Sequence, residues 1–251
     1  MQKALLNLKT SVQRVRDIAS DIDNNASPAL ADPAILARHQ TTQCAVTVIL
    51  SGFLESFMKE VAEGMISEIC TRNIPFQNLP DKIRVTHFLA GGYFLHQKAK
   101  DEQKAKAFAM NESADVVRRL ASAGVPQPPY ELLWEAFADT KANPGPDAIG
   151  DFLRNFGVQK PLPTLAAAMN VSENTFVIPL RSFMEVRNEC AHTGSSSNVP
   201  TTSDIQGYCD LVEQTASGTV LVLQAVLARD PFAAATLNKQ QPPPAVSPPT
   251  Q

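Results

Sequence analysis

The sequence predicts an all-α protein, a bundle of long antiparallel helices, and three observations lead to this prediction. Apolar residues recur at steps of three and four over long segments, which gathers them on one face of a helix. No long segment alternates apolar and polar residues, as a half-buried strand does. Strands and helices also do not alternate along the chain, so a parallel sheet is not expected.

The first two helices have the clearest patterns. Residues 1–24 keep the helical spacing of apolar side chains throughout, which predicts one helix. A second helix is expected from near Pro33 to about Cys70, because its apolar residues form a wide stripe. The segment 72–81 contains two prolines, which end this helix.

The middle of the chain is less regular. Helical patterns resume at about 81–98 and 101–123, and the pair Gly91-Gly92 weakens the first of them. The segment AGVPQPPYELLWEAF is then expected to be a loop, with a proline in the first turn of the next helix. Proline suits that position because the N–H groups of the first turn have no partner within the helix.

Residues 143–157 contain another helix end and another helix start. Asp147 and Asp151 lie one turn apart near the helix N-terminus, where carboxylates complement the helix dipole. We therefore interpret these two residues as structural. A short helix is expected to follow at about 162–170.

Two helices complete the pattern. One begins near Pro179 or slightly earlier, and the last runs to about residue 229 after TTSD, which resembles a capping box. No linker-like stretch divides the chain earlier, so residues 1–230 are expected to form one domain. Residues 231–251 are rich in proline and are expected to be a disordered tail.

Composition limits the classes of function. The 251 residues are 44% hydrophobic and 19% charged, as in ordinary soluble globular proteins, and suffice for a large core. The net charge of −3 leaves no large basic field, so a long nucleic-acid groove is not expected. A small RNA target held at a few points is compatible with this charge.

Cysteine usage and the apolar segments bear on the compartment. The four cysteines are far apart without CxxC spacing, so reduced thiols are expected. The first residues are amphipathic and charged, unlike a signal peptide, and no uninterrupted apolar run reaches membrane-spanning length. We therefore expect a cytoplasmic protein that does not bind membranes.

The stretch EVRNECAHTG, residues 185–194, is chemically the most informative. On a helix at about 100° per residue, its charged residues separate from its apolar residues with one exception. Arg187 falls among apolar side chains that include Leu180, Phe183 and Met184. Because a guanidinium cannot lose its charge to escape burial, Arg187 needs a partner or a wet cleft.

A structural interpretation explains part of this stretch. His192 lies in the last turn of the helix, where a cation meets the helix dipole favourably. Gly194 is a typical helix stop. Arg187 could pair with a carboxylate such as Glu55 for purely structural reasons.

The candidate catalytic residues Arg187, Asn188 and His192 also suit a reaction. The planar fork of arginine suits a phosphate, histidine moves protons near neutral pH, and asparagine can orient a hydroxyl. Together they suit RNA cleavage by the 2′-hydroxyl, with no metal or cofactor needed. Arg187 and His192 point about 140° apart on an ideal helix, so two copies across a two-fold axis would form the site jointly.

The segment VRNECAHTG resembles the signature of the HEPN superfamily, which is an arginine, a polar residue, three to five further residues and a histidine. The resemblance covers about residues 35–230, and this motif is its most specific part. It implies an all-α homodimer and a metal-independent endoribonuclease whose Arg187 and His192 line the dimer cleft. Many members are toxins in toxin–antitoxin or antiviral defence systems, so an antitoxin or defence-system protein would be a further partner.

One position departs from the HEPN pattern. Toxins that a partner nucleotidyltransferase modifies usually have a tyrosine two residues after the histidine. Gly194 stands there in this chain, which argues against that regulation.

Other interpretations of the same residues are weaker. Cys190 and His192 could hold zinc, but residues two apart diverge on a helix and no other ligand cluster is evident. Cys190 as a nucleophile is disfavoured because it lies on the apolar side. His39, His87 and His96 have no partner spacing and are expected to be surface or capping residues.

Three hypotheses about function follow from the sequence. The first is a metal-independent endoribonuclease, a toxin or antiviral-defence effector with RNA as its substrate. The second is a catalytically inactive dimeric module that binds RNA, a nucleotide or a protein partner. The third is a structural adaptor whose proline-rich tail is recognised by a partner.

Overall fold

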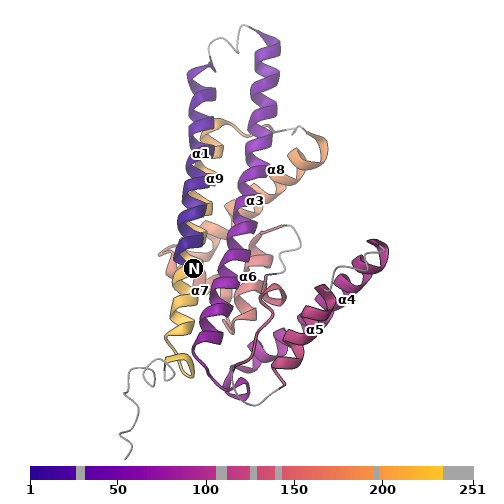
Figure 1. The fold of residues 1–251 in the computed structure, drawn as a ribbon. Helices are drawn as coiled ribbons and strands as arrows, with labels where there is room; N and C mark the ends of the chain where they lie inside the picture. The colour runs from indigo at the N-terminus through magenta and orange to yellow at the C-terminus, as the bar shows by residue number, and fades with distance from the viewer. Residues whose placement is uncertain (27–31, 106–111, 125–128, 139–142, 195–197, 234–251) are drawn as a thin grey trace, which may run out of the picture.

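The computed structural model describes residues 1–26, 32–105, 112–124, 129–138, 143–194 and 198–233. Within these ranges it contains helices and no strand, which confirms the predicted all-α class (Figure 1). Three long helices, α1 (Gln2–Asn24), α3 (Pro33–Thr71) and α9 (Thr202–Leu227), lie side by side and form the main bundle (Figure 1). The bounds of α1 and α3 agree closely with those predicted.

The three long helices pack because each presents a continuous apolar face to the other two. Val12 of α1, Val61 of α3 and Val212 of α9 are fully buried in this core. Arg16 adds a polar contact from α1 to α9, since its guanidinium donates to Asp210 at 2.7 Å and to Glu213 at 2.8 Å. Burial of the apolar faces is the main source of stability, because a partly exposed ion pair contributes little.

The start of α9 follows the predicted capping box. The Thr201 hydroxyl accepts from the backbone N–H of Asp204, and the Asp204 carboxylate accepts from the backbone N–H of Thr201. These two bonds satisfy N–H groups that would otherwise lack partners at the helix start. The sequence pattern TTSD thus predicted the N-terminus of α9 correctly.

Helices α7 (Pro161–Ala168) and α8 (Glu173–Thr193) pack against this bundle, and α6 (Pro146–Asn155) packs against α7, α8 and α4 (Asp81–Ala105). Asp147 lies in the first turn of α6, as predicted, and Asp151 pairs with Arg154 on the same helix. Helix α7 corresponds to the short helix expected at about 162–170. Helix α8 packs against α3, and this contact places the EVRNECAHTG stretch.

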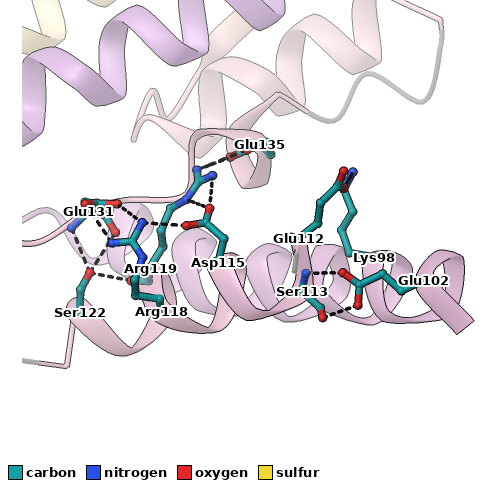
Figure 2. Close-up of polar contacts among 10 residues, drawn as sticks. All are labelled: Lys98, Glu102, Glu112, Ser113, Asp115, Arg118, Arg119, Ser122, Glu131 and Glu135. Atoms are coloured by element: carbon teal, nitrogen blue, oxygen red, sulfur yellow. Dashed lines mark hydrogen bonds and ion pairs between the residues drawn. The ribbon is translucent and has the colours of Figure 1, made fainter. Parts of the chain in front are cut away.

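Helices α4 (Asp81–Ala105) and α5 (Glu112–Ser122) pair with each other and project from the bundle (Figure 1). Polar contacts hold this pair together, as Figure 2 shows. Two contacts join α4 to α5, from Lys98 to Glu112 and from Glu102 to Ser113. Arg119 pairs with Asp115 within α5 and with Glu135 in the segment after α5. Arg118 adds a bridge to Glu131 at 2.9 Å in the segment after α5.

The structure corrects the prediction for α4. The helix continues to Ala105 without the break expected between residues 98 and 101, and it passes through Gly91-Gly92. A Cβ atom on Gly91 would lie 2.7 Å from Cδ2 of Leu120, so the missing side chain lets α5 approach closely. Close packing between the two helices therefore accounts for this glycine.

The structure agrees with the loop expected over AGVPQPPYELLWEAF, since the described residues 129–137 contain no α-helix. Residues 129–133 are irregular, and only a short 3-10 helix, η2 (Trp134–Phe137), follows. Two side chains accept from the backbone here: Ser122 Oγ from the N–H of Glu131 at 3.0 Å, and His87 Nδ1 from the N–H of Leu133 at 3.1 Å. These tertiary bonds satisfy amides that a helix would use, so the segment needs no helix of its own.

The chain remains folded shortly beyond α9. Phe232 is buried in the core, and the Arg72 guanidinium donates to the carbonyl oxygens of Leu227 and Phe232, each at 2.9 Å. Most of the proline-rich tail, residues 234–251, lies outside the described residues. Among the helices in the described ranges, none is both long enough and apolar enough to cross a membrane.

Candidate active site

Helix α8 carries all three predicted catalytic residues. It begins at Glu173, earlier than the start expected near Pro179, because the Ser172 hydroxyl accepts from the backbone N–H of Thr175 and caps the helix. Pro179 therefore lies inside the helix. The helix ends at Gly194, as expected, with a left-handed backbone (φ 68°) that glycine adopts without strain.

The faces of α8 follow the predicted pattern. Leu180, Phe183, Met184 and Cys190 are buried against the bundle. The charged residues Arg181, Glu185 and Glu189 are exposed. The buried face docks α8 on α3 and so fixes the direction of the polar residues between the two faces.

Arg187 is half-buried at the contact between α8 and α3, where its guanidinium bonds to a hydroxyl group on α3. Its Nε donates to Oγ of Ser51 at 2.9 Å, and its Nη1 donates to Oδ1 of Asn188 at 3.0 Å. These contacts explain how a guanidinium is accommodated beside the apolar face of α8. Within the described ranges, Nη2 and the second N–H of Nη1 have no protein partner, and so remain free for a ligand.

Glu55 does not pair with Arg187, contrary to the structural alternative considered from the sequence. Its carboxylate accepts from Lys59 Nζ at 2.7 Å, one turn along α3. Among the described residues, no carboxylate forms an ion pair with Arg187. The guanidinium charge at the site is therefore not neutralised by a neighbouring acid.

His192 is exposed in the last turn of α8. In the described part of the chain, no hydrogen bond joins His192 to Arg187 or Asn188. The structure thus brings Arg187 and Asn188 together, while His192 stands apart on the same helix. This agrees with the divergence of about 140° that an ideal helix imposes between Arg187 and His192.

Cys190, between these polar residues, is not suited to nucleophilic chemistry. It is buried, and desolvation raises the pKa of its thiol to about 12, with the nearby Cys44 thiol as the next cause. A thiol with that pKa stays protonated near neutral pH, whereas the thiolate is the nucleophile. Over the described ranges, no group of three or more His, Cys, Asp or Glu side chains could hold a metal ion.

The other histidines differ from one another. His96 is exposed and His39 half-buried, whereas His87 is fully buried in α4, which corrects its interpretation as a surface or capping residue. Its Nδ1 accepts from Leu133, and burial lowers its pKa to about 4. His87 is therefore neutral in the folded protein, and it serves the packing of α4 against residues 129–137.

A cavity of about 510 Å³ lies away from these residues, lined mainly by α9 and the segment leading into α7. None of Arg187, Asn188 and His192 lines it. The candidate site therefore lies outside this cavity.

Sequence reasoning missed Ser51. It lies 136 residues from Arg187, and a serine inside a long apolar helix carries no distinguishing pattern. The only available signal was indirect, because a half-buried arginine without an acidic neighbour requires an acceptor from another helix. Which helix supplies that acceptor depends on how α8 docks on α3.

The family relationship agrees with this architecture. The model of the RiboL-PSP-HEPN family matches residues 9–223, which include α8 and the α3 residues that contact it. No curated protein matches the chain, and no solved structure does either. HEPN domains are nuclease or RNA-binding modules, generally of the ribonuclease type. The chain thus belongs to the RiboL-PSP-HEPN family of the HEPN superfamily.

Proposed function

We propose that the protein is a metal-independent endoribonuclease whose site forms between two copies of the chain. The observation that carries this proposal is the pattern of hydrogen bonds and the unpaired charge of Arg187. Its guanidinium is held in place, has no acidic partner among the described residues, and keeps N–H donors for a phosphate. Family membership supports a ribonuclease-type activity for such a group.

The proposed reaction is an internal attack within RNA. The 2′-hydroxyl attacks the adjacent phosphorus, and the bond to the 5′-oxygen of the next nucleotide breaks. His192 accepts the proton of the 2′-hydroxyl, and the protonated imidazole then donates a proton to the leaving oxygen. Arg187 stabilises the negative charge that develops on the phosphoryl oxygens. The products carry a 2′,3′-cyclic phosphate and a 5′-hydroxyl.

The separation of the two residues supports a shared site. A single copy presents Arg187 half-buried at the contact between α3 and α8, and His192 on an exposed turn of the same helix. Two helices that meet near a two-fold axis bring the arginine of one copy toward the histidine of its partner. We propose that the homodimer acts in the cytoplasm as a toxin or antiviral-defence effector, with an antitoxin or defence-system protein as its partner.

The direct test is cleavage of RNA by the purified protein in EDTA, with Arg187→Ala and His192→Ala beside it. Arg181→Ala is the matched control, because Arg181 is an exposed arginine on the same helix. We expect wild type and the control to cut RNA and to leave 2′,3′-cyclic phosphate ends. Both site variants should lose at least about a hundredfold in rate while they stay folded.

The same experiment separates the alternative function. A wild type that binds RNA but does not cleave it, with binding weakened by Arg187→Ala, would identify an inactive RNA-binding module. Equal cleavage by wild type and both site variants would exclude the assignment of Arg187 and His192. In that case a contaminating nuclease would have to be ruled out with a preparation purified identically from cells that lack the chain.

A further inference from the structure

Ser51 lies on α3, yet its hydroxyl is directed at the candidate site on α8. Oγ donates to the carbonyl oxygen of Val48 at 2.9 Å and accepts from Nε of Arg187 at 2.9 Å. Because the hydroxyl proton is used within α3, the lone pairs of Oγ are available to the guanidinium. The side chain is only 1% exposed, so water does not compete for this bond.

The chemical type of this acceptor matters for Arg187. A carboxylate in the same place would hold the guanidinium but would also neutralise its charge. A hydroxyl fixes the orientation and leaves the positive charge available to a phosphate. The carboxylate one turn further along α3, that of Glu55, is engaged by Lys59.

The two bonds of Arg187 come from different elements. Ser51 holds Nε from α3, and Asn188 holds Nη1 from α8 itself. A planar guanidinium held at two of its three nitrogens loses little further freedom when it binds a ligand, which is the benefit of preorganisation. Arg187 uses only the oxygen of the Asn188 side chain, and no described residue bonds to its amide nitrogen.

We propose that Ser51 is a positioning residue of the ribonuclease site, which aims the Arg187 guanidinium at the RNA phosphate without neutralising it. This inference rests on the proposed function above. It adds α3 to the elements that build the site. It also assigns a role in the reaction to a serine that otherwise resembles any small residue of the helix core.

The first test compares Ser51→Ala with two other variants. Ser51→Thr keeps the hydroxyl acceptor. Thr47→Val is the matched control: Thr47 lies one turn earlier on α3, is also buried, and its hydroxyl donates to the carbonyl oxygen of Gln43 at 2.8 Å. We expect Ser51→Ala to lower kcat by about tenfold, with a smaller change in KM, because the guanidinium acts mainly in the transition state. Ser51→Thr should stay within about threefold of wild type, and Thr47→Val should behave like wild type.

A double-variant comparison shows whether Ser51 acts through Arg187. Any residual activity of Arg187→Ala should not fall further when Ser51→Ala is added, since the group to be positioned is already gone. If Ser51→Ala lowers the activity of the Arg187→Ala variant by the same factor as it lowers that of wild type, Ser51 acts independently of Arg187, and the proposal is overturned. A fall in the thermal midpoint equal to that of Thr47→Val, without loss of kcat, would overturn it as well.

A second readout does not depend on catalysis. The Nε–H group of Arg187 gives a resonance in a ¹⁵N–¹H spectrum, which Arg187→Lys identifies by its disappearance. We expect Ser51→Ala to shift this resonance or to broaden it through exchange with water, and Thr47→Val to leave it unchanged. If the wild type cleaves no RNA, the proposed function fails. If the Nε–H resonance of Arg187 is unchanged in Ser51→Ala, that result contradicts the positioning role itself.

Discussion

Arg187 illustrates how one residue can satisfy a packing requirement and remain chemically available. Its side chain is half-buried on α8, and its partners among the described residues, Ser51 and Asn188, are both neutral. Neutral acceptors satisfy the N–H groups that burial would leave unpaired while the full charge is kept. A structural arginine would more often be matched with a carboxylate, as Arg16 is with Asp210 and Glu213.

His87 predicts a dependence of stability on pH. Its pKa is about 4 in the folded protein, against an ordinary value of 6.5, because burial disfavours the charged ring. A lowered histidine pKa contributes stability that is fully present above pH 6.5 and is lost as pH falls toward 4. When the pH is lowered from 7.5 to 5, His87 gains a proton mainly in the unfolded chain. The free energy of unfolding should therefore fall by about 2 kcal/mol.

Urea unfolding at pH 7.5 and pH 5 measures this contribution. His87→Asn is the comparison, because its Oδ1 can accept from the Leu133 N–H but does not titrate. Carboxylates with lowered pKa values, such as Glu131, add an acid dependence of their own that is common to both proteins. If the loss between the two pH values is as large in His87→Asn as in wild type, His87 is not the titrating group.

Cys190 is predicted to be unnecessary for RNA cleavage. Its thiol is buried and has a pKa of about 12, so it takes no part in the chemistry proposed for its neighbours. Cys190→Ala should retain RNA cleavage within about threefold of wild type, with some loss of stability from the smaller side chain. Loss of cleavage in a folded Cys190→Ala protein would revive the interpretation of this cysteine as a nucleophile.

At the scale of single elements, α9 shows how one helix meets different neighbours along its length. Gly218 faces α7, where an added Cβ atom would lie 2.6 Å from Cγ of Met169 and 2.9 Å from Cδ1 of Leu165. Gly207, on the same helix, has nothing within 4 Å of that position. One glycine therefore allows two helices to approach closely, whereas the other has no such role.

This difference predicts effects of opposite sign for the same substitution. Gly218→Ala should destabilise the protein by about 1–3 kcal/mol, because the buried Leu165 of α7 and the half-buried Met169 just after it must move. Gly207→Ala should stabilise it by up to about 1 kcal/mol, because alanine favours the helix and nothing obstructs it. Thermal unfolding of the two variants beside wild type checks the prediction, and equal shifts would contradict the close contact between α7 and α9.

At the scale of the whole molecule, the proposed shared site can be tested by mixing variants. Arg187→Ala and His192→Ala each remove one half of every site in a homodimer. In a mixed dimer, one of the two sites combines an intact Arg187 from one copy with an intact His192 from its partner. Co-expression of the two inactive chains should therefore restore about a quarter of wild-type cleavage, if the chains pair at random.

Two affinity tags, one on each variant, allow the mixed dimer to be isolated and assayed alone. It should then show about half of the wild-type rate, since one of two sites is complete. A mixed dimer as inactive as its parents would show that Arg187 and His192 act within one copy. A protein that remains monomeric at all concentrations used in the assay would contradict the shared site directly.

Much of the architecture followed from local patterns in the sequence. The periodicity of residues 1–24, the apolar stripe of α3, the capping box before α9 and the stop at Gly194 each depend on neighbouring residues, so a sequence reveals them. The arginine, asparagine and histidine of α8 were identified in the same way, together with the family signature. Their chemical roles remain the subject of the proposed experiments.

Other features were decided only by tertiary structure. The path of the loop at 129–137 depends on Ser122 and His87, which accept from its backbone N–H groups. Helix α4 continues past its expected end, and Gly91 within it admits Leu120 of α5. In both cases the deciding contacts join residues distant in sequence, and a local pattern contains no information about them.

Some features of the candidate site were likewise determined by the sequence, and others only by the tertiary structure. By itself the sequence determined which helix carries the polar residues, and that Arg187 needs a partner, because charge and helical spacing are local properties. Only the docking of α8 on α3 decided that this partner is the hydroxyl of Ser51 rather than the carboxylate of Glu55. Burial of apolar surface determines that docking, and it positions polar groups that no sequence spacing connects.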